Sequence, residues 1–107
     1  MTLLNEYLND LNSDMSNLLS KYDVTTYTKE EDINKGLLRF NKSPKGKAFL
    51  FVFPDEKIRI FHTISMKFSI KIYFFDKNKK LINSKYSEPN IKKIHSKEPA
   101  MFVVEVP

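Results

Sequence analysis

A six-residue run in the middle of the chain, Ala48–Phe53, contains no polar side chain. Successive side chains of a strand point to opposite faces of a sheet, so an unbroken apolar run must be covered on both faces. Pro54-Asp55-Glu56 follows and predicts a turn. The sequence therefore predicts one central strand with a core on either side.

The rest of the chain predicts further short strands separated by turn residues. Their ranges are 23–28, 57–61, 69–75, 81–86, 91–95 and 101–106. A short helix is expected over 29–36, with Thr28 and Glu31 as a capping box and Gly36 after its last turn. Such a pattern is typical of a mostly β (α+β) domain, here a small, mainly antiparallel β barrel with one short helix.

Residues 1–22 predict a separate amphipathic helix, with residues 23–107 as a single domain. Its apolar residues follow an alternating spacing of four and three: Leu4, Leu8, Leu11, Met15, Leu18 and Tyr22. Glu6, Asp10 and Asp14 form an acidic ridge, which we expect to point outward. The apolar stripe fits two alternatives, docking on its own domain or pairing with a second copy or another protein.

The net charge of +5 is unevenly distributed. Residues 57–97 hold eleven lysines and arginines against two acidic residues. Such asymmetry favours an acidic partner, either nucleic acid or an acidic protein. The alternative is compositional bias, because sixteen of the eighteen basic residues are lysine.

No cysteine is present, the first residues do not form a signal peptide, and no run approaches the roughly 18 apolar residues that span a bilayer. These features predict a cytoplasmic protein without a membrane partner.

Five segments, in order, resemble motifs of the uncharacterised family called domain of unknown function 192. They are Ile33–Leu38, Phe49–Pro54, Phe61–Phe68, Ile70–Asn78 and Phe102–Pro107. The resemblance covers about residues 23–107. It implies a compact, barrel-like β domain with one short helix, and it brings no known activity or cofactor.

The chain departs from the family pattern at four positions. Ser65 and Lys79 stand where the family usually has glycine, Ser69 where it has proline, and Lys71 where it has aspartate. If the backbone at Ser65 or Lys79 has a positive φ, the side chain there costs about 1 kcal/mol. Lys71 reverses the charge of an acidic position, and we expect it on the outer face of its strand.

His62 is the one catalytic candidate, near Thr63 and Ser65 in sequence. A general base needs an orienting partner, and no nearby carboxylate has a catalytic spacing. The favoured interpretation is therefore a mostly buried, structural aromatic residue. With only two histidines and no cysteine, no metal site and no cofactor are expected.

The function favoured by the sequence is a non-enzymatic binding module with a basic β face. Tyr73 alternates onto the face of Lys71, and basic residues nearby complete the expected binding set of Lys67, Lys71, Tyr73, Lys85 and Lys92. The alternative is a small-molecule-binding or hydrolytic site around His62.

Overall fold

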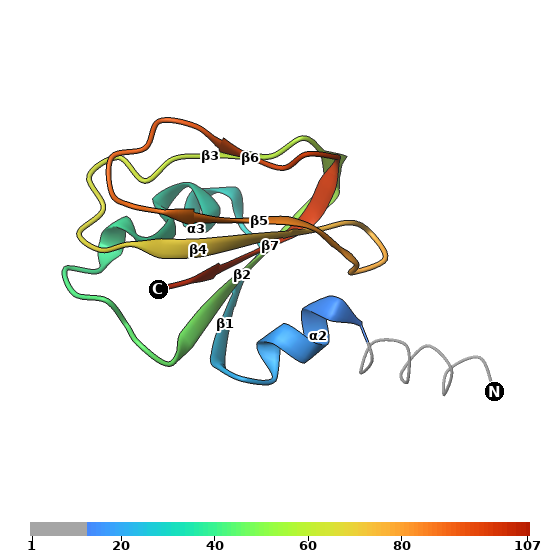
Figure 1. Cartoon of the computed structure of the whole chain (residues 1–107), viewed down its shortest axis with the longest axis horizontal. Helices are drawn as coiled ribbons and strands as arrows, with labels where there is room; N and C mark the ends of the chain where they lie inside the picture. The colour runs from blue at the N-terminus through green and yellow to red at the C-terminus, as the bar shows by residue number, and fades with distance from the viewer. Residues whose placement is uncertain (1–12) are drawn as a thin grey trace.

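The computed structural model describes residues 13–107, which build one five-stranded mixed sheet in the order β1-β2-β7-β4-β5 (Figure 1). The strands are β1 (Asp23–Tyr27), β2 (Lys47–Lys57), β4 (Ile70–Phe75), β5 (Leu81–Ser87) and β7 (Ala100–Val106). β1 runs parallel to β2, and the other neighbours are antiparallel. A second, two-stranded sheet pairs β3 (Ile60–Phe61) with β6 (Ile94–His95).

The expected closed barrel is wrong for the part of the chain described. β1 and β5 are the two edges of the larger sheet and do not pair with each other. The connection from β1 to β2 explains the difference, because a parallel pair needs a crossover segment that covers one face. Helices and the β3–β6 pair thus cover a sheet that stays open.

The apolar run lies in β2 and supplies both faces of the sheet, as expected. Phe49 and Phe51 join a cluster with Ile72, Phe74 and Val103. Ala48 and Leu50 point the other way, into a cluster with Met15, Phe75 and Val104. The expected turn at Pro54-Asp55-Glu56 lies instead inside β2, where the register with β7 shifts between Val52 and Lys57.

Helix α2 (Asp14–Leu19) covers the second of these faces. Met15 is buried against the sheet, and Leu18 and Leu19 pack beside it. Asp14 does not point away from the domain, since its carboxylate accepts a hydrogen bond from the Leu81 backbone N–H at 2.8 Å. This part of the predicted helix therefore docks on its own domain, and residues 1–12, with Glu6 and Asp10, lie outside the described residues.

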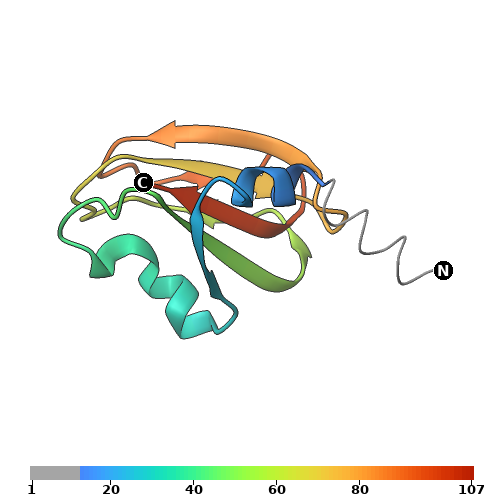
Figure 2. The same ribbon diagram turned by 90° about the horizontal axis from the view of Figure 1, so that it is seen from below.

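The opposite face is covered by α3 (Glu30–Lys35), the 3₁₀ helix η1 (Gly36–Arg39) and the β3–β6 pair (Figures 1 and 2). The predicted capping box is wrong, because α3 is capped at Lys29 without a side-chain hydrogen bond. Gly36 does end α3, at φ 49°, as the sequence predicted. None of the helices in residues 13–107 is long and apolar enough to span a membrane.

Ser65 and Lys79 both have a left-handed backbone, at φ 65° and 64°. The glycines that the family resemblance implies at these two positions would adopt this backbone conformation without strain. This chain adopts it with serine and lysine instead. The left-handed conformation costs such residues about 1–2 kcal/mol, which glycine avoids.

We expect Ser65→Gly and Lys79→Gly each to raise the free energy of unfolding by roughly 0.5–1 kcal/mol, since relief of the positive φ exceeds the extra flexibility of glycine in the unfolded chain. Urea denaturation measures this change. Lys85→Gly is the matched control, because it lies within β5 and should destabilise the domain. A loss of stability in all three variants would contradict the prediction.

Candidate functional site

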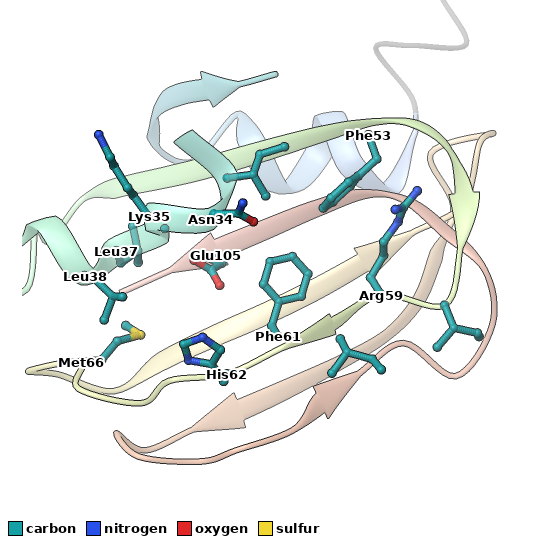
Figure 3. A pocket seen from close by; sticks show the side chains of 14 residues that line it. Asn34, Lys35, Leu37, Leu38, Phe53, Arg59, Phe61, His62, Met66 and Glu105 are labelled. Carbon is teal, nitrogen blue, oxygen red and sulfur yellow. The ribbon is translucent and has the colours of Figure 1, made fainter. Parts of the chain in front are cut away.

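A cavity of about 290 Å³ opens between the covering segments and the sheet (Figure 3). Its walls come from α3, η1, the end of β2, β3 and one residue of β7. Most of the lining is apolar: Ile33, Leu37, Leu38, Phe53, Ile58, Ile60, Phe61 and Met66. The polar side chains of the lining are Asn34, Lys35, Arg59, His62 and Glu105, and we call this cavity the Glu105 pocket.

Glu105 is the buried charged residue of this pocket, with 4% of its surface exposed. In the register of β7, it lies opposite Phe49 on one side and Ile72 on the other, and both point into the core. Directly opposed residues share a face, so Glu105 points the same way. Figure 3 shows its carboxyl group directed into the pocket.

The Glu105 carboxyl group has no hydrogen bond or ion pair with any other residue in 13–107. Burial without such a partner disfavours the ionised form and raises the pKa of Glu105 to about 8. At neutral pH the group is therefore mainly an uncharged acid, which can donate a hydrogen bond from its O–H.

His62 lies at the same pocket and is exposed, so the expectation that it is mostly buried is wrong. Phe61 takes the core position instead, with its ring 6.1 Å from the rings of both Phe51 and Phe74. His62 Nδ1 accepts a hydrogen bond from the Ile64 backbone N–H at 3.2 Å. We assign the ring proton to Nε2 on this basis, which makes Nε2–H the donor that remains.

Arg59 lines the pocket, but its guanidinium group binds residues other than Glu105. Its guanidinium donates to the Ala100 carbonyl at 2.9 Å and to Asp55 Oδ1 at 2.9 Å, and it stacks 3.9 Å from the Phe53 ring centre. The hydrogen bond from Arg59, followed by that from Lys57, lowers the pKa of Asp55. Arg59 therefore holds the pocket wall together and does not neutralise Glu105.

Thr63 and Ser65, which the sequence grouped with His62, do not line the Glu105 pocket. Thr63 is fully buried, and its hydroxyl donates to the Glu88 carbonyl at 2.7 Å and accepts from the Ile91 N–H at 3.0 Å. It ties two connecting segments together. The Ser65 backbone N–H donates to Asn90 Oδ1 at 3.0 Å.

The five residues of the expected basic face do not share one face of the sheet. Lys71 and Tyr73 lie together on the side covered by α2, with the Lys71 ammonium 5.2 Å from the Tyr73 ring centre. Lys71 is exposed between buried Ile70 and Ile72, as expected. Lys85 pairs with Ile72 and therefore belongs to the opposite side.

Lys67 and Lys92 are exposed residues of connecting segments. A second hollow, of about 390 Å³, brings Lys85 together with Lys93 and His95, beside Lys92 in sequence. We call it the basic hollow. Glu88 is the one acidic residue in its lining. Within residues 13–107, no three His, Asp or Glu side chains gather as metal ligands would.

Sequence reasoning missed Glu105, although a signal for it exists. The residue interrupts an otherwise apolar closing strand, and two-residue alternation from Val103 puts it on the core face. An acid at a core position of a strand indicates either a hidden partner or a functional group.

A family model described as "Uncharacterized ACR", DUF192, matches residues 11–107. The chain belongs to the DUF192 family. The match confirms the resemblance and extends it beyond the expected start near residue 23, into the N-terminal helix. No curated protein matches the sequence.

Two solved structures resemble this DUF192 domain, both with a TM-score of 0.73 over 79% of the chain. One is a protein of unknown function from Novosphingobium aromaticivorans, at 14% identity, and the chain spans 62% of its length. The other is a Sinorhizobium meliloti protein described as a putative transcription regulator, at 16% identity and with 67% covered. At these identities the likeness establishes the fold alone.

We expect the wild-type domain to lose stability as the pH rises from about 5 to about 8, relative to the Glu105→Gln variant. The unfolded chain releases the Glu105 proton near its ordinary pKa of 4.5, whereas the folded domain holds it up to about 8. The contribution of Glu105 to the free energy of unfolding is therefore greatest below its pKa in the unfolded chain. It falls by a few kcal/mol in total as the pH rises to its pKa in the folded domain.

Urea denaturation of both proteins across this range measures the difference, and contributions common to the two proteins cancel in it. Parallel stability curves for the two proteins would show that Glu105 is ionised in the folded state.

Proposed function

We propose that this DUF192 domain binds a small molecule in the Glu105 pocket. The observation that carries the proposal is a residue with 4% of its surface exposed, whose carboxyl group has no partner in residues 13–107 and points into a mainly apolar cavity. No side-chain nitrogen or oxygen that is sealed from solvent within residues 13–107 lacks a hydrogen-bond partner, so the Glu105 carboxyl oxygens reach the open space of the pocket, where a ligand can contact them. Apolar walls with a few convergent polar groups are the usual composition of ligand pockets.

Binding fits the pocket better than the hydrolytic alternative around His62. General-base catalysis needs a free lone pair on the imidazole. Nδ1 uses its lone pair on the Ile64 N–H, and Nε2 then carries the proton.

A substitution at the pocket rim tests the proposal. Leu38 lines the pocket and is 43% exposed, so Leu38→Trp adds bulk at the entrance without enlarging the core. Leu81 is equally exposed, at 45%, and lies away from the pocket, which makes Leu81→Trp the matched control. We expect fragments that bind the wild-type domain in protein-observed NMR to bind Leu38→Trp at least about tenfold more weakly and Leu81→Trp unchanged.

Fragments that bind all three proteins alike, or a library without any binder, would contradict a ligand pocket here. The chemical shifts of Glu105, Phe61 and Met66 report where each fragment lies.

A second candidate function is binding of an acidic partner by a basic surface, as the sequence favoured, but over fewer residues than expected. The basic hollow concentrates Lys85, Lys93 and His95 near Lys92, with Glu88 as the one acidic lining residue. We propose that an acidic partner, nucleic acid or a protein, contacts this side of the domain. Lys71 and Tyr73 lie on the other side of the sheet and do not belong to that surface.

For this second function, we expect single-stranded DNA to bind the Lys85→Ala/Lys93→Ala variant several-fold more weakly than the wild type, because each lost phosphate contact removes part of the counterion release. Lys71→Ala is the control and should bind like the wild type. Fluorescence polarisation at low and moderate salt measures both affinities. Binding that is insensitive to salt, or equally weakened by Lys71→Ala, would refute an anion-binding role for the hollow.

A further inference from the structure

Two polar groups at the Glu105 pocket, the Glu105 acid and the His62 ring, are hydrogen-bond donors at neutral pH, whereas the Asn34 amide offers both a donor and an acceptor. The Glu105 carboxyl group accepts no hydrogen bond from an N–H and pairs with no cation within residues 13–107, and burial raises its pKa to about 8, so it is an O–H donor at neutral pH. His62 presents Nε2–H, because Nδ1 accepts from the Ile64 backbone. A ligand that satisfies these groups must offer an acceptor.

The charges around the pocket decide which kind of acceptor fits. The Arg59 guanidinium is engaged by Asp55 and the Ala100 carbonyl. Lys35 is exposed, and Figure 3 shows its side chain extending away from Glu105. An anionic ligand would therefore lose its hydration without gaining a fixed cation at the bottom of the pocket. An uncharged acceptor avoids that penalty.

A cationic ligand meets the opposite difficulty. It would bind only after Glu105 has lost its proton, and the domain as a whole carries +5. The apolar walls, with Phe53 and Phe61 edge to face at 6.2 Å and Met66 buried nearby, favour an uncharged hydrocarbon body.

We infer that the pocket takes a small, uncharged molecule with a carbonyl oxygen on an apolar body. The carbonyl accepts a hydrogen bond from the Glu105 O–H, His62 Nε2–H is a second donor, and the hydrocarbon part packs against Phe53 and Phe61. This inference rests on the proposed ligand pocket and specifies its ligand class.

Three probes with similar hydrocarbon chains and different head groups test the ligand class: 2-heptanone, hexanoate and hexylammonium. Their affinities are measured by NMR titration on the wild type, Glu105→Gln and Glu105→Leu. Glutamine keeps a neutral donor of similar shape, whereas leucine removes it. We expect 2-heptanone to bind most tightly, to keep its affinity in Glu105→Gln within a few-fold, and to lose roughly tenfold in Glu105→Leu.

The pH dependence gives an independent readout. In the wild type, 2-heptanone affinity should be constant below the pKa of Glu105 and fall between about pH 7 and about pH 9.5, because the ionised carboxylate repels a carbonyl oxygen and the ketone has no N–H to donate to it. Glu105→Gln should show no such fall. Tighter binding of hexylammonium, with loss in Glu105→Gln, would overturn the inference in favour of a cationic ligand.

Equal affinity of the three probes, or no binding by any of them, would also overturn the inference. The fragment library with the Leu38→Trp variant tests whether the pocket binds small molecules at all. If fragments bind there but the three probes do not behave as expected, the ligand class is wrong and the proposed function stands.

Discussion

Burial of β2 on both faces is the constraint on which the rest of this structure depends. Its side chains alternate between two apolar clusters, so neither face of the sheet tolerates water. One face is covered by α2, whose Met15 and leucines lie over Ala48 and Leu50. The other is covered by the crossover segment α3–η1 together with the β3–β6 pair. Two different covers on one sheet explain why the domain needs no barrel closure.

The second cover also creates the pocket. Short helices and a two-residue strand pair cannot fill a sheet face as evenly as one long helix does, and the gap between them exposes the inward side of β7. Glu105 occupies that position. A leucine there would fill space and avoid the cost of burying a carboxyl group without a partner. A residue that breaks the local rule for a core position without visible compensation is characteristic of a functional site.

The central strands and two left-handed positions could be predicted from sequence, because both follow from neighbouring residues, whereas the turn expected at Pro54-Asp55-Glu56 lies inside β2. The apolar run marked β2, alternation marked β4, and the family glycines missing at Ser65 and Lys79 marked two left-handed positions. The expected common face of Lys71, Tyr73 and Lys85 failed for a different reason. Alternation in β4 places Lys71 and Tyr73 on one face, but the pairing register between β4 and β5 decides that Lys85 lies on the other.

The sequence by itself determined that this chain builds a small, two-sided β core, because strand periodicity is a local property of the chain. It also established the family, through motifs confirmed over residues 11–107. Only the tertiary structure decided that the sheet stays open, that His62 is exposed, and that Glu105 lacks a partner inside a cavity. Whether a side chain is buried and whether it has a hydrogen-bond partner depend on segments that lie far apart in the chain. A carboxyl group on β7 becomes distinctive only when α3, η1 and β3 fold over it and supply no hydrogen bond.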